Sequence, residues 1–296
     1  MLLRPAAAVL SLLATGLACG GCGQEAGAER TAANASGGRF EAPAVGRVAR
    51  IWAVGDAATP TPRARRVASR VRRARPELLL YLGDVYEAGT PDEFRRNYRP
   101  LFGSLHARTA PTPGNHEWPL ARAGYFPYWR QSLGRPLPSY YSFRVAGWRI
   151  LSLNSEGPHG PRSAQVRWLK RRLRGGGNCR LAFWHRPRYS AGPHGDAADL
   201  QPFWRAVRGR VRLILNGHEH NLQRLRRRAG TTVLISGAGG ASPYRFPRRD
   251  RRLVFGNDRV GGALKLRLAP GRARYAFISG GGRVLHRGTA RCRPPS

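Results

Sequence analysis

Short apolar runs alternate with amphipathic, arginine-rich stretches through most of the chain. The run at 48–54 predicts a strand, and the uninterrupted apolar run at 78–82 predicts a strand that is buried on both faces. Residues 62–74, between these runs, are rich in arginine. Val67 and Val71 lie four positions apart there and form one apolar stripe, which predicts a helix.

The remaining signals extend this alternation toward the C-terminus. Thr90 suits an N-cap and Pro91 a first helical position, so a helix is expected over 91–102. Three glycines at 175–177 end a further helical pattern at 163–173. The other expected elements are strands at 140–145, 149–153, 180–184 and 211–215, a helix near 199–207, and several strands after 231. Strands that alternate with helices predict a layered α/β fold.

Side chains with metal-binding atoms follow four of these apolar runs and the segment before Pro113. They are Asp56, Asp84, Asn115 with His116, His185, and His218 with His220. A glycine precedes four of the five groups and lets the backbone turn sharply there. Because ligands of α/β sheets gather at the carboxyl ends of strands, we expect these side chains to meet at one edge.

The chemistry of this set points to metal ions. It offers nitrogen and oxygen atoms and no thiolate, which suits zinc, iron or manganese. A carboxylate can bridge two cations, and two metal ions about 3.5–4 Å apart can hold a phosphoryl group during in-line displacement. The sequence therefore predicts a phosphoesterase with two divalent or trivalent metal ions.

Five motifs make the chain resemble the calcineurin-like metallophosphoesterases, and among them the purple acid phosphatase-like branch. They read GD at 55–56, GDVY at 83–86, GNHE at 114–117, WHRPRYS at 184–190 and GHEHN at 217–221, and SGAGG at 236–240 also matches that branch. The resemblance covers roughly residues 48–280. It implies a four-layer α/β/β/α sandwich of two mixed sheets flanked by helices. It also implies hydrolysis of phosphomonoesters by a metal-bound hydroxide that attacks phosphorus in line.

The resemblance assigns a role to each motif residue. Asp84 is expected to bridge the two metal ions and to count as catalytic for that reason. The other expected ligands are Asn115, His185 and His218 on one metal, and Asp56 and His220 on the second.

Three residues are expected to bind the substrate. His116, which is also expected to be catalytic, stands beside the phosphate and stabilises or protonates the leaving group. Asn115 lies next to it, and His194 belongs to a loop that resembles a phosphate-facing loop of the purple branch. The alternative for His194 is an exposed loop histidine.

One metal position departs from the family pattern. The wider family has Asp-x-His in its first motif, but here alanine stands two residues after Asp56. In the purple branch a tyrosine three residues after the bridging aspartate replaces that histidine, whereas Tyr86 follows Asp84 by two. Either Tyr86 or Glu87 ligates through a reshaped loop, or this metal keeps only its remaining protein ligands and water.

The charge of the chain is strongly unbalanced. Lys and Arg total 52 against 16 Asp and Glu, which gives a net charge of +36. Arginine codon preference explains part of the excess, but such a cation also binds phospholipid, anionic wall polymers or nucleic acid. Nucleic acid is less favoured, because aromatic residues do not alternate with the arginine clusters. Two alternatives to a phosphomonoesterase stay open: a phosphodiesterase or nuclease of the same fold, and a non-catalytic polyanion-binding envelope protein with a degraded metal site.

The N-terminus is typical of an exported protein. Residues 1–22 predict a signal peptide, because Arg4 precedes an apolar run at 6–18 that is too short to span a ~30 Å hydrocarbon core. Small residues before Cys19 resemble a lipoprotein cleavage site; plain secretion and a retained signal anchor are the alternatives.

We expect a flexible tether over 23–45 and one phosphoesterase domain over 46–293, located outside the cell or in its envelope. Cys179 and Cys292 form one disulfide in that environment or remain two buried thiols.

Overall fold

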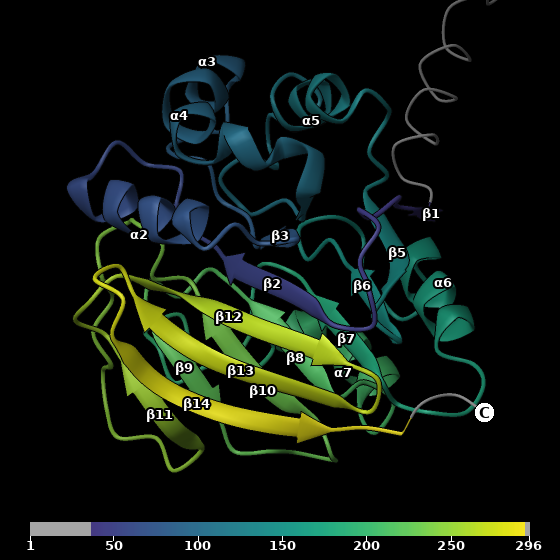
Figure 1. Cartoon of the computed structure of the whole chain (residues 1–296). Coiled ribbons are helices and arrows are strands. Elements are labelled where there is room, and N and C mark those ends of the chain that lie inside the picture. Colours follow the sequence, from purple (N-terminus) through teal and green to yellow (C-terminus); the bar gives the residue numbers. More distant parts are fainter. Residues whose placement is uncertain (1–36, 294–296) are drawn as a thin grey trace, which may run out of the picture.

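The computed structural model describes residues 37–293, in which two mixed β-sheets pack face to face between helices (Figure 1). This arrangement confirms the four-layer α/β/β/α sandwich that the sequence predicts. The predicted signal peptide, the lipidation at Cys19 and most of the predicted tether lie outside the described residues.

The six-stranded sheet has a parallel half and an antiparallel half. In order across the sheet, its strands are β14 (Val284–Arg291), β13 (Arg272–Ser279), β12 (Gly262–Ala269), β2 (Ala49–Val54), β3 (Leu78–Tyr81) and β4 (Thr109–Pro111). Strands β2, β3 and β4 are parallel, and β12, β13 and β14 are added antiparallel to β2 and to one another. The carboxyl ends of β2 and β3 therefore lie side by side.

The eight-stranded sheet is built around four parallel strands. In order across the sheet, its strands are β1 (Gly37–Arg39), β5 (Tyr140–Val145), β6 (Trp148–Ser152), β7 (Arg180–Phe183), β8 (Leu213–Asn216), β10 (Thr232–Ser236), β9 (Leu222–Leu225) and β11 (Leu253–Asn257). Strands β6, β7, β8 and β10 are parallel, whereas β5 is antiparallel to β6, and β9 is antiparallel to both β10 and β11. Turns that follow β7 and β8 thus share one edge of the sheet.

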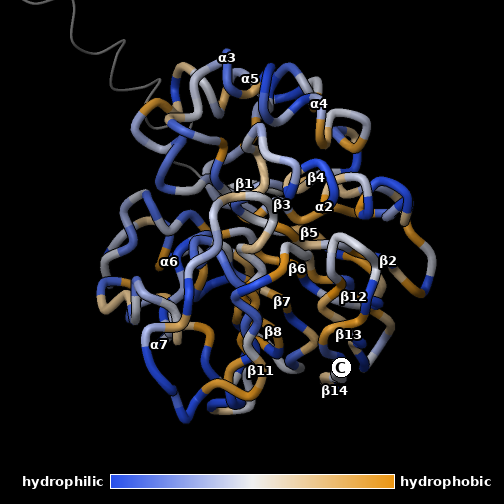
Figure 2. The backbone as a smooth tube through the Cα atoms, turned by 90° about the vertical axis from the view of Figure 1, so that its left-hand side faces the viewer, coloured by the Kyte–Doolittle hydropathy of each residue, from blue (hydrophilic) through white to orange (hydrophobic). Residues whose placement is uncertain are grey.

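Two apolar cores hold the layers together. The larger core joins the facing sides of the two sheets and includes the buried stripe of α2 (Pro62–Arg73). The smaller core lies between the other side of the eight-stranded sheet and the helices α6 (Ala164–Arg172) and α7 (Gln201–Val207). In β8, Leu213 and Leu215 belong to the larger core and Ile214 to the smaller, as the alternation of side chains along a strand requires. Figure 2 shows the apolar residues concentrated in the strands and the polar ones in the outer helices and loops.

The segment at 91–102 is helical, as predicted, but it is not one α-helix. It consists of α3 (Pro91–Glu93), a π-helical turn at Phe94–Tyr98, and α4 (Arg99–Phe102). Pro100 has no amide hydrogen to donate within this segment, and the Arg99 amide bonds to the Phe94 carbonyl, five residues earlier. Thr90 caps the segment as expected and forms a capping box with Glu93.

The remaining helices complete the chain. The sequence did not predict α5 (Tyr125–Leu133), which packs near α4 (Figure 1). Short 3₁₀ turns at Gly103–Arg108 and Ala198–Leu200 precede β4 and α7. Within residues 37–293, no helix has the length and apolar character that a membrane span requires.

The folded part begins earlier than the predicted boundary at residue 46. Gly37–Arg39 forms β1, which pairs in parallel with β5. The Phe40 ring is buried and stacks on Tyr141, with 5.0 Å between ring centroids. Residues 37–39 of the predicted tether are therefore part of the eight-stranded sheet.

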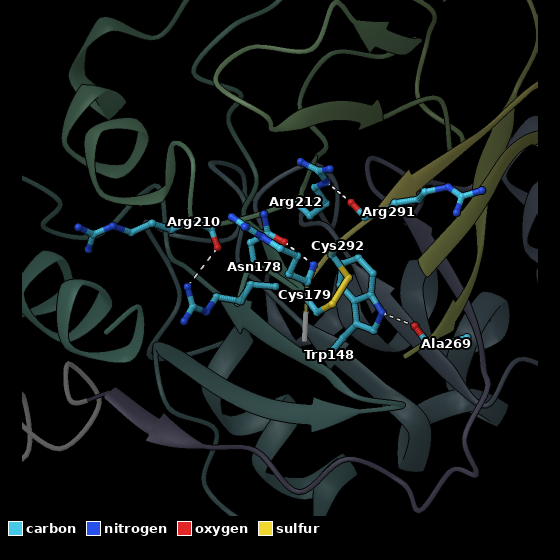
Figure 3. Close-up of a disulfide and its surroundings, with 10 residues drawn as sticks. Trp148, Asn178, Cys179, Arg210, Arg212, Ala269, Arg291 and Cys292 are labelled. Carbon is cyan, nitrogen blue, oxygen red and sulfur yellow. Dashed lines mark hydrogen bonds between the residues drawn. A yellow bond between two sulfur atoms is a disulfide. The ribbon is translucent and has the colours of Figure 1, made fainter. Parts of the chain in front are cut away.

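Cys179 and Cys292 form a disulfide, which decides between the two alternatives that the sequence left open. It links the start of β7 to the chain just after β14, across 113 residues of sequence (Figure 3). The Trp148 side chain lies beside it, and its indole N–H donates to the Ala269 carbonyl at 2.8 Å.

Candidate metal centre

The predicted ligands come together where the carboxyl ends of strands from both sheets meet. Asp56 and Asp84 follow β2 and β3 of the six-stranded sheet, and His185 and His218 follow β7 and β8 of the eight-stranded sheet. The His218 backbone N–H donates to Asp56 Oδ2 at 2.9 Å and so joins the two sets of turns. The centre therefore lies at the junction between the sheets.

One group of donor atoms surrounds His185 Nε2. This nitrogen is 3.0 Å from Asn115 Oδ1, 3.2 Å from His218 Nδ1 and 3.3 Å from Asp84 Oδ2. His185 Nδ1 lies 2.7 Å from the Leu82 carbonyl oxygen and donates its hydrogen there, so Nε2 presents a lone pair in the neutral ring. A cation among these atoms would relieve the repulsion between their lone pairs.

A second group of donor atoms surrounds the Tyr86 hydroxyl. The hydroxyl oxygen is 2.8 Å from His220 Nε2, 3.1 Å from Asp56 Oδ1 and 3.2 Å from Asp84 Oδ2. His220 Nδ1 donates to the Ser242 carbonyl at 2.7 Å, so its Nε2 lone pair faces the hydroxyl group. Asp84 Oδ2 belongs to both groups, which is the position that a bridging carboxylate needs.

The structure brings Tyr86, and not Glu87, into this second group. Tyr86 is buried, whereas Glu87 is exposed and its backbone N–H donates to Glu93 at 2.6 Å. The shorter spacing between Asp84 and Tyr86 therefore does not keep the hydroxyl away from the other donor atoms.

Burial and charge set the protonation of the centre. Burial raises the pKa of Asp56 well above its ordinary value. Burial is the largest effect on Asp84 and acts in the same direction, but the interactions of this carboxylate with His185 and His116 together outweigh it and hold the pKa of Asp84 below its usual range. Burial lowers the pKa of His218 to about 2 and that of His220 to about 4, so both rings are neutral at pH 7. Neutral imidazoles and carboxylates are the forms that bind metals.

The backbone at the centre is strained in places. Asp56, Asp84 and His218 have φ of 56°, 68° and 69°, in the left-handed region that residues with a side chain rarely adopt. A Cβ atom on Gly83 would lie 2.6 Å from His185 Nδ1, so only glycine fits there. Strain of this kind persists where the surrounding structure enforces it, and it clusters at functional sites.

His116 lies at the exposed side of the first group. Its Nδ1 lies 2.5 Å from the Glu87 carbonyl oxygen and donates to it, which leaves Nε2 facing the centre at 3.9 Å from Asp84 Oδ2. The His116 backbone N–H donates to Asp84 Oδ1 at 3.2 Å. His116 thus both holds the central carboxylate and presents a ring nitrogen next to it.

His194 lies against the histidines of the centre. Its ring centroid is 4.2 Å from that of His218, and 42% of its side chain is exposed. Tyr244, which the sequence analysis missed, stacks on His220 at 3.8 Å. The only signal for Tyr244 was an aromatic residue shortly after the SGAGG motif.

Two buried carboxylates support the loops around the centre. Glu117 is fully buried and accepts the backbone N–H groups of Asp84 at 3.2 Å and Val85 at 3.1 Å, while burial raises its pKa to about 8. Glu219 is also buried and accepts the Ser190 hydroxyl at 2.8 Å. Both carboxylates therefore hold the loops in place.

The residues present fit a pair of metal ions. Asp56, Asp84 and His185 each offer an atom within 4.8 Å of the others, and all three are buried. The donors around His185 Nε2 and around the Tyr86 hydroxyl form two groups with Asp84 in common. Buried carboxylates and lone pairs at this density are costly without a cation between them.

The sequence of the chain is similar to those of known proteins. A family model for calcineurin-like phosphoesterases matches residues 49–222, more than half of the chain. A Synechococcus sp. protein, described as a probable cyclic nucleotide phosphodiesterase, is 31% identical over 173 residues. That match covers 54% of this chain and 64% of the relative, less than two thirds of its length.

Solved structures share the fold at low sequence identity. A purple acid phosphatase from yellow lupin seeds superposes with a TM-score of 0.67 at 18% identity, covering 84% of this chain and 54% of that one. An anchor protein of the Plasmodium inner membrane complex superposes with a TM-score of 0.67 at 14% sequence identity, and the match covers 84% of this chain and 90% of that one. A dimetal phosphatase from Danio rerio superposes with a TM-score of 0.57 at 14% sequence identity, and the match covers 82% of this chain and 98% of that one. With the family model matching across both sets of ligand-bearing turns, the chain belongs to the calcineurin-like phosphoesterase family.

Proposed function

We propose that the protein is a metal-dependent hydrolase of phosphomonoesters. The observation that carries the proposal is the pair of donor groups at the junction of the sheets, around His185 Nε2 and around the Tyr86 hydroxyl. Two adjacent groups that share Asp84 suit two cations side by side. Phosphoester hydrolysis is the chemistry that defines the family.

Each metal would have its own set of residues. Asp84, Asn115, His185 and His218 would hold one, and Asp56, Asp84, His220 and Tyr86 the other. When bound, metal ions supply Lewis-acid stabilisation of phosphoryl oxygens and lower the pKa of water at the site. Zinc, iron and manganese all accept these nitrogen and oxygen ligands.

His116 would supply the proton for the leaving group. Because its Nδ1 donates to the Glu87 carbonyl, a protonated His116 carries its second hydrogen on Nε2, the nitrogen that faces the centre. That hydrogen can pass to a departing alkoxide. Asn115 Oδ1 lies 3.0 Å from His185 Nε2, and the His194 ring lies against that of His218, so both residues are at the same centre.

A phosphodiester is the second candidate substrate. The Synechococcus relative supports it, since that protein is described as a probable cyclic nucleotide phosphodiesterase. A phosphomonoester carries close to two negative charges at neutral pH and a diester only one. A site with two cations and the histidines His116 and His194 therefore favours the monoester.

The test is hydrolysis of p-nitrophenyl phosphate and bis(p-nitrophenyl) phosphate by the full chain loaded with manganese, iron or zinc. We expect faster turnover of the monoester, and a loss of about 10²–10⁴-fold in His116→Ala, because general acid catalysis contributes that much. Elemental analysis should find the same metal content in both proteins.

The matched control is His286→Ala. His286 lies in β14, away from the centre, and stacks on Phe255 of β11. This variant should retain wild-type turnover. A faster diester reaction would establish the second candidate, and an absence of turnover with every metal would leave a non-catalytic polyanion-binding protein.

We also propose that the protein is exported and acts outside the cell or in its envelope. Two features support this: the signal-like pattern at 1–22 and the disulfide between Cys179 and Cys292, since disulfides persist in oxidising compartments. Its partners would be an anionic phosphate ester and an anionic membrane surface or wall polymer. Protease protection in intact and lysed cells tests the location.

A further inference from the structure

Arginines line two adjoining cavities at the end of the eight-stranded sheet that is opposite the metal centre. β7 begins at Arg180 on this side and ends at Phe183, directly before the turn that carries His185. One cavity, with a volume of about 170 Å³, is lined by Arg144, Arg149, Arg174 and Arg180 together with glycines 175–177. The second, of about 380 Å³, is lined by Arg144, Arg149 and Arg172 together with Phe40 and Ala42. Because Arg144 and Arg149 line both, we call the two cavities the arginine groove.

The positive charge of the arginine groove has no counter-ion within residues 37–293. No ion pair in this part of the chain includes any of its five arginines, which are Arg144, Arg149, Arg172, Arg174 and Arg180. Glu41, beside the groove residue Phe40, pairs with Arg135 instead. Burial lowers the pKa of Arg180, and the charges of Arg149, Arg210 and Arg144 lower it further. The guanidinium groups therefore lie close enough to repel one another.

The base of the arginine groove is held rigidly and its rim is free. Arg180 is only 7% exposed, and its Nη2 donates to the carbonyls of residues 174–176 at 3.1–3.4 Å. Arg149 Nη1 donates to the Arg172 carbonyl. Arg144 and Arg174 are exposed, and no side-chain hydrogen bond of theirs occurs in the described residues. Two free guanidinium groups thus stand above a fixed, positively charged base.

We propose that the arginine groove binds a phosphate-bearing anion, at a site separate from the metal centre. Guanidinium groups match the geometry of phosphate oxygens and bind them with charge-assisted hydrogen bonds. Arg210 and Arg212 also lie in the surroundings of the disulfide, where Arg180 Nη1 donates to the Arg210 carbonyl at 3.3 Å (Figure 3). The groove is rich in donors that remain charged at any physiological pH.

The phosphate has two possible sources, a soluble phosphate compound or a phospholipid headgroup. Phe40 and Ala42 line the groove, so the chain that leads from the signal-like N-terminal region enters the domain beside it. Attachment of that region to a membrane would bring the groove close to the headgroups.

The test compares two variants of the full, metal-loaded chain. R144Q/R174Q removes the two free guanidinium groups of the groove. The matched control R66Q/R73Q removes two exposed charges from α2, so both variants lose the same net charge. The first probe is methylenediphosphonate, a non-hydrolysable diphosphate, titrated by calorimetry. The second is a vesicle of phosphatidylcholine with about 30% phosphatidylglycerol, at near-physiological ionic strength.

We expect R144Q/R174Q to weaken one class of methylenediphosphonate sites by about tenfold or more, because each lost bond to a charged group costs at least a factor of this order. The control should change by less than twofold, and both variants should hydrolyse p-nitrophenyl phosphate as the wild type does. If vesicle binding falls together with diphosphonate binding, the source is a headgroup; if only diphosphonate binding falls, it is a soluble phosphate. Equal diphosphonate binding by the two variants would overturn the proposal, whatever the vesicles show.

Discussion

Tyr86 reaches the second donor group although its position in the sequence differs from the family pattern by one residue. The motif spacing allows Tyr86, Glu87 or no protein ligand at all at this metal position. The decision depends on the conformation of the loop, which places the hydroxyl within 3.2 Å of Asp56, Asp84 and His220. Spacing along a chain does not determine such a contact.

Tyr86→Phe tests whether this hydroxyl is a metal ligand. We expect iron-loaded wild-type protein to absorb visible light through an iron–tyrosinate bond, and Tyr86→Phe to lose that band while its backbone fold is unchanged. Burial raises the pKa of Tyr86, so a metal ion is needed to displace the proton. Tyr189→Phe, at a buried tyrosine that stacks with Arg188, should keep the colour, and a band that survives in Tyr86→Phe would exclude the bond.

Glu117→Gln tests the support of the central carboxylate. Glu117 accepts two backbone N–H groups of the loop that carries Asp84, and an amide side chain can accept only with its oxygen. We expect metal affinity to fall about 10–100-fold, the usual range for residues that orient ligands. Titration calorimetry measures the metal affinity. The control is Glu87→Gln, at an exposed residue of the loop that carries Asp84, and it should bind metal with the wild-type affinity. Equal affinities in both variants would mean that the Glu117 carboxylate does not position Asp84.

At the scale of elements, the sequence predicted those helices and strands that are marked by a pattern of neighbouring residues. The apolar runs located β2 and β3, the stripe of Val67 and Val71 located α2, and the glycines at 175–177 located the end of α6. The strand β9 was missed because it opens an arginine run that reads as a solvated surface, and only pairing with β10 and β11 makes it a strand. The helix α5 was missed because its aromatic residues are weak helix formers that pack on distant partners, such as Tyr98 against Trp129 at 5.2 Å.

The same distinction applies to the candidate site. The motif residues could be named as candidates from sequence, because most of them follow an apolar run whose end could be located. The stacking of Tyr244 on His220 and the bonds of Glu117 to the Asp84 loop were not found, since they join segments that lie far apart in the chain.

Thr61→Ala tests the cap of α2. The Thr61 hydroxyl oxygen accepts the Ala64 N–H at 3.1 Å, and its hydrogen is donated to the Gly240 carbonyl at 2.8 Å. We expect the free energy of unfolding to fall by about 1–2 kcal/mol, because both a cap and a bond to another loop are lost. Urea denaturation measures the loss, with Thr289→Ala on the exposed side of β14 as the control. A change of the same size in both variants would point to alanine substitution in general and not to the cap.

At the scale of the whole molecule, the disulfide closes a long loop of chain. Cys179 and Cys292 are 113 residues apart, and the segment between them contributes strands to both sheets. We expect Cys179→Ser/Cys292→Ser to lower the free energy of unfolding by about 2–5 kcal/mol, the range found when such cross-links are removed. Turnover of p-nitrophenyl phosphate well below the unfolding temperature should remain, because the disulfide lies at the opposite end of β7 from His185. A folded variant without turnover would show that the two ends of this strand are coupled.

The division of the ligands between the two sheets also bears on when the centre can form during synthesis. Asp56 and Asp84 emerge from the ribosome early, but His185, His218 and His220 follow more than a hundred residues after Asp56. β2, which positions Asp56, has β12 as its second neighbour, and β12 lies at Gly262–Ala269. A nascent chain therefore has no complete set of ligands before residue 220 of its 296 residues, and β2 lacks its second neighbour until β12 has been made. Metal capture becomes one of the last events of maturation, and a partly made chain stays without hydrolytic activity.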